Sequence, residues 1–303
     1  MKGLLKFLLA LGIIAAFSIS VNAQIRVLGG GMYGTTTKYE TLDSAVLKVL
    51  YEVKLQPEQS LMESKDSVSI DTDYMVLEIG ETGISRYYSD NKRKTDSLMA
   101  EMLKKSNSVR LNTEFLKENG ISSMGNTLEI FKNYPAGKMT VTDNIITSSY
   151  LYEEPMDEFA WEITTDTMTC LQYVCQKAVC DFRGRHYEAW FAPELPINNG
   201  PWKFSGLPGL ILSVATADGL YSFKAIGLEN YEAPVQFAKK TFIKASRKDF
   251  EKVKRRSIED MAGSLSNLNS SSNMKVEVRV QTDSGGTRSL DEVRFVYHPM
   301  EID

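Results

Sequence analysis

Three cysteines could carry redox or metal chemistry: Cys170, Cys175 and Cys180 are spaced five residues apart, and His186 follows closely. Thiolates and imidazoles are the usual ligands of zinc, but this spacing matches no standard zinc pattern, so we expect no metal site. In one extended strand Cys175 and Cys180 would lie roughly 16 Å apart on opposite faces, whereas a disulfide needs Cα atoms within about 7 Å. A turn within residues 171–174 would bring Cys170 to Cys175. We therefore predict a disulfide between Cys170 and Cys175 and a buried free thiol at Cys180.

Asp181 and His186 face each other if the chain turns at residues 183–184 and forms a hairpin. A carboxylate beside an imidazole could serve as a general base. No convincing nucleophile accompanies the pair, because Ser205 has no nucleophile-elbow sequence around it. We favour a cross-strand polar pair on the sheet surface. The alternative is an exported hydrolase or redox enzyme that uses Cys180 or the Asp181–His186 pair.

The most unusual stretch is GPWKFSGLPGLIL, residues 200–212. Residues 207–210 predict a type II turn, in which Pro208 fixes φ at the first central position and Gly209 supplies positive φ at the second. Gly206 adds backbone freedom in front of the turn. We expect a rigid corner that leads into a buried strand. A corner that lines a cleft or a partner surface is the alternative. The glycines do not form a phosphate loop, because no Gly-Lys-Ser/Thr follows.

Aromatic side chains are concentrated around this corner. Packing in the core is one interpretation, and a subset that lines a groove for an apolar ligand or a partner segment is the other. The residues that we select as candidates for such a binding surface are Tyr187, Trp190, Phe191, Trp202, Phe204 and Leu207.

The elements that must position these residues are mostly strands. Alternating or continuous apolar patterns joined by short turns recur along the chain, and no regular strand-helix-strand pattern appears. The clearest helix is predicted over residues 246–262, with Ser246 and Asp249 as a capping box. A further one or two helices are predicted within 90–119, and 264–272 is predicted to be a flexible loop. We therefore predict a mainly β (α+β) fold: a large curved antiparallel sheet or half-barrel with two or three packed helices.

The N-terminus has the features of an export signal. Two lysines precede an apolar stretch over residues 8–18, and residues 21–23, Val-Asn-Ala, offer the small side chains that a signal peptidase recognises. We predict a signal peptide over residues 1–23, cleaved after Ala23, and a protein of the periplasm or cell surface. No later stretch approaches the about 20 apolar residues of a transmembrane helix. We expect a flexible lead-in over residues 24–43.

The length of the chain predicts a single domain, and its net charge argues against nucleic-acid binding. We expect residues 44–303 to form a single β-rich domain, and a hydrophobic content of 43% is ordinary for a globular protein. The net charge is −4, and removal of the two lysines of the signal peptide makes it −6. This balance argues against a nucleic-acid partner, which would call for clustered lysine and arginine. No cofactor motif is present, and we expect none.

The region from the predicted hairpin to the corner resembles the GLPGLI family, which is named for the corner motif and found in the Bacteroidota. The matching stretches are YVCQKA at 173–178, FRGR at 182–185, YEAWF at 187–191, PELPI at 193–197 and GLPGLIL at 206–212.

Weaker similarities at Tyr51, residues 77–89 and residues 299–302 extend the resemblance over most of the mature chain. Gln172, where the family tends to have Gly, and the additional Cys170 depart from the family pattern. The resemblance implies an exported protein without an established activity, of a kind often encoded beside TonB-dependent outer-membrane receptors. The strand pattern is also similar to that of the half-barrel lipoprotein carriers of the periplasm, although a fold does not settle a function.

Our first expectation is an exported, non-enzymatic binding protein of the cell envelope. It would hold an apolar ligand or an envelope protein on a curved sheet near residues 187–212. Besides the enzyme hypothesis given above, the other alternative is an accessory subunit that docks on a TonB-dependent receptor through an exposed sheet edge.

Overall fold

The fold is described from a computed structural model. It describes residues 22–28, 37–55, 71–105, 108–111, 113–146, 148–156, 158–271, 275–281, 287–288, 297 and 299–302. The predicted signal peptide, apart from its last two residues, therefore lies outside the described residues.

Twelve strands form one open sheet in the order β14-β8-β7-β6-β4-β3-β2-β13-β12-β11-β10-β9. Neighbouring strands are antiparallel except β14 and β8, which are parallel. The mainly β fold class is therefore confirmed. The strands are β2 (Lys38–Leu55), β3 (Asp71–Gly80), β4 (Ser85–Ser89), β6 (Glu129–Lys132), β7 (Lys138–Ile145), β8 (Ser148–Pro155), β9 (Glu162–Cys170), β10 (Tyr173–Phe182), β11 (Arg185–Ala192), β12 (Leu210–Thr216), β13 (Tyr221–Lys239) and β14 (Ile243–Lys244).

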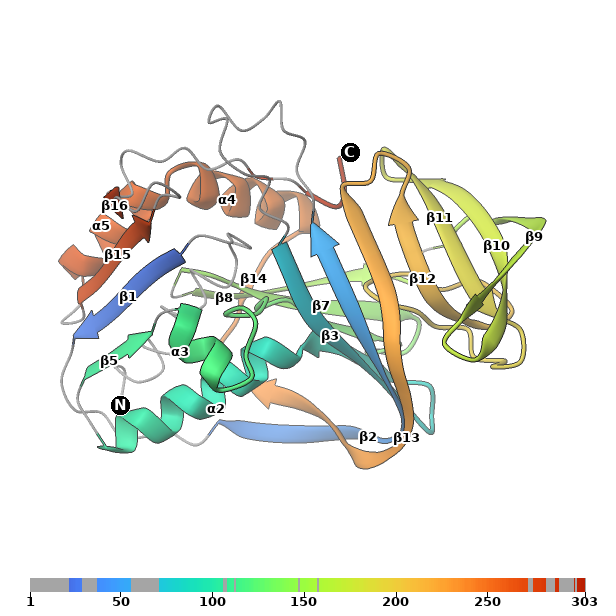
Figure 1. The fold of residues 1–303 in the computed structure, drawn as a ribbon, viewed down its shortest axis with the longest axis horizontal. Coiled ribbons are helices and arrows are strands. Elements are labelled where there is room, and N and C mark those ends of the chain that lie inside the picture. Colours follow the sequence, from blue (N-terminus) through green and yellow to red (C-terminus); the bar gives the residue numbers. More distant parts are fainter. Residues whose placement is uncertain are drawn as a thin grey trace.

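The two longest strands, β2 and β13, pair along their whole length at the centre of the sheet. Figure 1 shows them curving between β3, β7 and β8 on one side and β9 to β12 on the other. Three register shifts interrupt their pairing, and such bulges bend strands and increase their twist. Alternate side chains of β2, among them Leu47, Val49 and Tyr51, are buried in the core, as their spacing predicts. The bent centre thus lets both parts of one sheet share a single core.

Within the described residues four helices accompany the strands: α2 (Asp90–Lys105), α3 (Thr113–Glu118), α4 (Arg247–Glu259) and α5 (Met261–Ser271). The N-cap of the predicted capping box of α4 is present, because the Ser246 hydroxyl accepts a hydrogen bond from the Asp249 N–H at 3.1 Å and donates one to the Asp249 carboxylate at 2.6 Å. The apolar side of α4 packs on β8, with the Phe250 ring 5.8 Å from Tyr150 and 5.5 Å from Tyr152.

The expected flexible loop at 264–272 is wrong, because α5 continues to Ser271. The serines and asparagines of this stretch suggested a loop by composition. The Asp260 carboxylate, however, accepts the N–H of Gly263 at 3.0 Å and satisfies a free donor at the start of the helix.

A second, four-stranded sheet has the order β16-β15-β1-β5. Its strands are β16 (Thr287–Arg288), β15 (Lys275–Gln281), β1 (Asn22–Leu28) and β5 (Ser108–Leu111). The expected flexible lead-in over 24–43 is therefore wrong in two places, because β1 pairs with β15 and β5, and β2 already begins at Lys38. Strand pairing with distant segments supplies order that a weak local pattern does not reveal.

Candidate functional site

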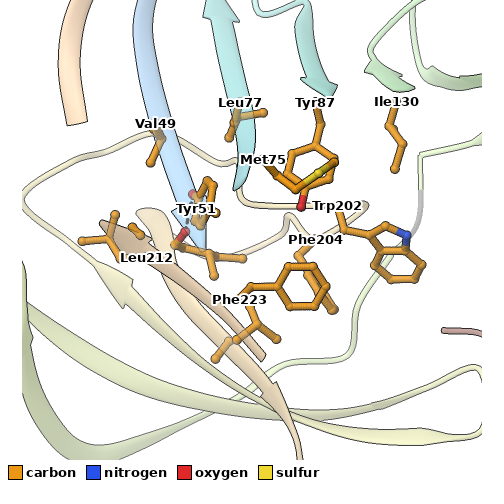
Figure 2. Close-up of a cluster of buried hydrophobic side chains, with 14 of the residues drawn as sticks. Val49, Tyr51, Met75, Leu77, Tyr87, Ile130, Trp202, Phe204, Leu212 and Phe223 are labelled. Carbon is orange, nitrogen blue, oxygen red and sulfur yellow. Dashed lines mark hydrogen bonds between the residues drawn. The ribbon is translucent and has the colours of Figure 1, made fainter. Parts of the chain in front are cut away.

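The corner segment, residues 198–209, is buried except at Asn198, Gly206 and Pro208. The ring of Phe204 lies 5.0 Å from the ring of Tyr187 on β11 and 5.9 Å from that of Phe223 on β13. Figure 2 shows Phe204 and Trp202 in one cluster with side chains of β2, β3, β4, β6 and β13. The concave side of the sheet is thus occupied by the protein's own chain.

Most of the predicted binding residues belong to this core. Trp190 differs, since it is half-buried on the opposite face of β11, with the ammonium of Lys177 6.0 Å from its ring. For the other five candidates, the interpretation as core packing holds, and their side chains do not line an open groove. The five that are at most 5% exposed are Tyr187, Phe191, Trp202, Phe204 and Leu207.

The corner turns in a different way from the predicted type II turn. Gly206 has φ +94°, and its N–H is held by the side chain of Asn198, whereas Gly209 is not in the positive-φ region. Gly209 is required for another reason: a Cβ there would lie 2.3 Å from the carbonyl oxygen of Ala192. The backbones of the corner and of β11 approach so closely that no side chain fits between them. The corner therefore has the structural role that was predicted. Glycine is needed at position 209 because the Ala192 backbone lies so close, and not because Gly209 adopts a positive φ.

Lys132 anchors the corner segment from the other part of the sheet. Its ammonium is fully buried and donates to Asn199 Oδ1 at 2.9 Å and to the carbonyl oxygens of Gly200 and Phe204, both at 2.8 Å. Burial lowers the pKa of Lys132 well below its ordinary value. The Asn199 amide in turn donates to Ser85 Oγ at 2.9 Å. Neutral oxygens on the corner segment therefore hold the cation.

A buried ionic cluster lies beside the corner. Lys203 pairs with Glu301 at 2.6 Å and also with Glu154 of β8. Arg183 binds both carboxylates, and Arg247 of α4 lies 3.0 Å from Glu301. Because these side chains are largely buried, the pairs must compensate for the loss of water around each charge.

This cluster holds the last described residues of the chain. Arg185 donates to the carbonyl oxygens of Pro299 at 2.8 Å and Met300 at 3.2 Å, and the Tyr187 hydroxyl donates to Met300 at 3.0 Å. The N–H of Ile302 binds the Arg183 carbonyl at 3.0 Å. The C-terminal segment is therefore fastened to the tip of the β10–β11 hairpin.

The sequence offered only weak signals for these groups. Lys203 stands between two aromatic residues of an apolar motif, and an isolated charge in such a setting needs a buried partner. Glu301 lies in a Pro-Met-Glu-Ile stretch at residues 299–302, where it is the charged residue among apolar neighbours. Nothing local marks Lys132 or Glu154, which depend on contacts with residues far along the chain.

The cysteines are free and buried, which differs from the predicted disulfide. Cys170 and Cys175 nonetheless lie on either side of the turn at 171–172, where Cys170 pairs with Tyr173 and the Cys175 thiol donates to the Tyr173 carbonyl oxygen at 3.7 Å. Burial raises the pKa of Cys180 to about 12, with a smaller contribution from the charge of Asp181. A thiol with such a pKa is protonated at neutral pH and is a poor nucleophile.

Asp181 and His186 are paired as the hairpin predicts, with Nδ1 of the imidazole 2.9 Å from Oδ1 of the carboxylate. Both side chains are exposed on the outer face. Cys180 lies on the inner face, because successive side chains of a strand point to opposite sides. The residues of the enzyme hypothesis therefore do not converge. Among the described residues, no group of three or more His, Cys, Asp or Glu side chains could hold a metal ion.

The β9 strand forms one edge of the sheet and pairs only with β10 among the described strands. Its pairing has a register shift beside Gln176, whose side chain binds the Thr164 carbonyl at 2.8 Å. Beyond this bulge Thr167, Met168 and Thr169 pair regularly with β10. Apolar side chains exposed at this end are Met168 (37%), Leu171 (43%) and Val174 (55%).

Comparisons with known proteins give one family match, on part of the chain, and two structures with low similarity. Residues 183–213 match the model of a family described as a protein of unknown function, Porph_ging. No curated protein matches significantly. Two structures of PNGF-II, in the P21 and C2 space groups, are similar at TM-scores of 0.47 and 0.43. Their identities are 9% and 12%; the similarity covers 71% of this chain, which spans about a third of each PNGF-II chain (34% and 33%).

None of the described helices is both long enough and apolar enough to span a bilayer. The family match falls on the hairpin and the corner that were singled out in the sequence. Because the family is described as one of unknown function, the match assigns no activity to the hairpin or the corner.

Proposed function

We propose that the protein is an exported, non-enzymatic accessory protein of the cell envelope that takes an extended segment of a partner protein onto the open edge of β9. The observation that carries this proposal is the end of β9 beyond its bulge. An unpaired edge offers a row of backbone donors and acceptors to which a further strand can bind.

The composition of this edge supports the proposal. Natural edge strands are commonly blunted by lysine, proline or a bulge. The bulge beside Gln176 protects the first part of β9, but residues 167–171, Thr-Met-Thr-Cys-Leu, contain neither a charged residue nor a proline. The exposed side chains of Met168, Leu171 and Val174 border the same stretch. This arrangement suits a segment with apolar side chains in extended conformation.

The filled interior also favours the edge over the concave face. A small apolar ligand needs an open cavity lined by apolar groups. The aromatic side chains that could line one are packed against each other, and the corner segment occupies the space. We therefore place partner binding at the edge and not at the motif.

Site-specific photo-crosslinking in the native envelope tests this proposal. A photoreactive residue at Thr167 is expected to give a covalent adduct with a partner protein, and mass spectrometry of the adduct should identify an extended segment. The matched control places the same residue at Ile226 of β13, which is 42% exposed on the sheet away from the edge, and should give no such adduct.

Two double substitutions provide the second part of the test. Met168→Lys with Val174→Lys should reduce the recovered adduct at least about tenfold, since a desolvated charge at a strand interface costs more than 1.4 kcal/mol. Val46→Lys with Ile226→Lys, at positions that are both 42% exposed, should leave it unchanged. Equal adduct yields at Thr167 in both double variants would rule out the edge as the binding surface.

A further inference from the structure

Cys170 and Cys175 occupy adjacent strands at the closed end of the β9–β10 hairpin. Cys170 pairs with Tyr173 across the two-residue turn, so Cys175 is the next residue of β10 on the same side of the hairpin. Diagonal positions of this kind have Cα atoms about 7–8 Å apart. A disulfide therefore requires an approach of only about 1 Å.

Both cysteines carry free thiols, and the Cys175 thiol donates to the carbonyl oxygen of Tyr173 at 3.7 Å, beside the turn that joins the two strands. Cys175 is fully buried and Cys170 is 9% exposed, at the solvent end of the hairpin. The outer thiol is thus the one that a reagent reaches first.

We infer that Cys170 and Cys175 form a redox-active dithiol, which closes into a disulfide across the β9–β10 hairpin by exchange with an oxidised disulfide and reopens with a reduced thiol. This inference goes beyond the proposed partner binding and does not depend on it. The bond would tie the proposed edge strand to β10 at the end where β9 carries no bulge.

The exchange proceeds in two balanced steps. The Cys170 thiolate attacks one sulfur of an external disulfide, which forms a mixed disulfide and releases one thiolate. Cys175 then loses its proton to solvent and attacks the Cys170 sulfur, which forms the Cys170–Cys175 bond and releases the second thiolate. Two protein thiols are oxidised and one external disulfide is reduced to two thiols.

The difference in burial assigns the order of attack: Cys170 is the outer thiol, and Cys175 is fully buried. In the same sense, the interaction of the two side chains lowers the pKa of Cys170, and together with burial it raises the pKa of Cys175. A thiolate is the attacking species. Cys170 therefore starts the reaction and Cys175 resolves it.

Thiol trapping of the full chain tests this inference. The reduced protein is equilibrated with mixtures of reduced and oxidised glutathione, quenched in acid, denatured and alkylated, and its modified cysteines are mapped by mass spectrometry. The expected result in oxidising mixtures is one alkylated thiol, Cys180, and a Cys170–Cys175 linked peptide. Reduction should restore three alkylated thiols.

Single substitutions provide the controls. Cys180→Ser should retain the linked peptide. Cys175→Ser should accumulate glutathione on Cys170, whereas Cys170→Ser should accumulate far less on Cys175. Three alkylated thiols in the folded wild-type protein at the most oxidising mixture, or a bond that includes Cys180, would overturn the inference even if no variant folds.

Discussion

Lys132 shows how one buried charge can organise a motif that lies far from it in the sequence. Its ammonium binds three oxygens of residues 199–204, none of them charged. A neutral oxygen left without its donor in the core costs roughly 1–3 kcal/mol. The side chain therefore connects β6 to the corner segment through hydrogen bonds that no other described cation provides to these oxygens.

Lys132→Met should lower the free energy of unfolding by about 3 kcal/mol, because it fills similar space but leaves the buried carbonyl oxygens of Gly200 and Phe204 without this donor. Urea denaturation followed by tryptophan fluorescence measures the change. Lys48→Met removes a lysine that pairs with Glu229 at the surface, so it should change stability by only about 0.5 kcal/mol. Similar losses in both variants would contradict the role of the buried ammonium.

The pH dependence of Lys132 has a defined sign. Its pKa is lowered in the folded state, so between that pKa and the ordinary value of 10.5 the unfolded chain binds more protons than the folded chain. The stability contribution of this group therefore rises as pH increases through that window, and below the folded pKa the penalty for the buried charge is fully present. Lys132→Met should lack this component of the pH profile.

At the scale of elements, the corner depends on contact between two backbones. Residues 206–209 lead into β12, and the place where a Cβ of Gly209 would lie is already taken by the Ala192 carbonyl. The Ala192 backbone cannot move aside for an added Cβ as a flexible side chain could. Glycine is therefore required at 209 by space, and the turn residue with positive φ is Gly206.

Gly209→Ala should lower the free energy of unfolding by about 1–3 kcal/mol, as expected when atoms are forced into a packed interior. The matched control is Gly227→Ala in β13, where a Cβ would meet only Leu50 at an ordinary 3.8 Å. This control should leave stability unchanged or slightly raised. Thermal melts of both variants decide the matter, and an unaffected Gly209→Ala protein would show that the corner is looser than the structure indicates.

The hairpin of β10 and β11 was predictable because its signals are local. Alternating apolar residues flank Arg183-Gly184, and the predicted pair of Asp181 with His186 is confirmed. The N-cap of α4 was predictable for the same reason. Strand β1, by contrast, is paired with segments far along the chain, and no local pattern specifies such partners.

At the scale of the whole molecule, Glu301 joins parts that are distant in the chain. It binds side chains from the hairpin tip, the corner and α4, and it is 4% exposed. Removing one partner from a buried ionic cluster leaves uncompensated charge in the interior. Through Glu301 the C-terminal segment therefore connects the hairpin tip, the corner segment and α4.

Glu301→Gln should lower the free energy of unfolding by about 3–5 kcal/mol. Its control is Glu229→Gln, whose carboxylate is 61% exposed and pairs with one lysine, so the expected change is about 0.5 kcal/mol. Chemical denaturation at low and high salt separates the two, because salt screens the surface pair far more than the buried one. Equal effects would show that the cluster contributes no more than a surface pair.

The sequence by itself determined the mainly β class, the β10–β11 hairpin and the structural importance of the corner, because alternation, turn residues and capping act between near neighbours. Only the tertiary structure decided that the aromatic residues around the corner are core and that Gly209 is a point of close approach. It also decided that Lys132 and Glu301 secure the corner and the C-terminus. Burial and ion pairing depend on contacts between segments that come together only when the sheet bends around the corner segment. No local sequence pattern specifies these contacts.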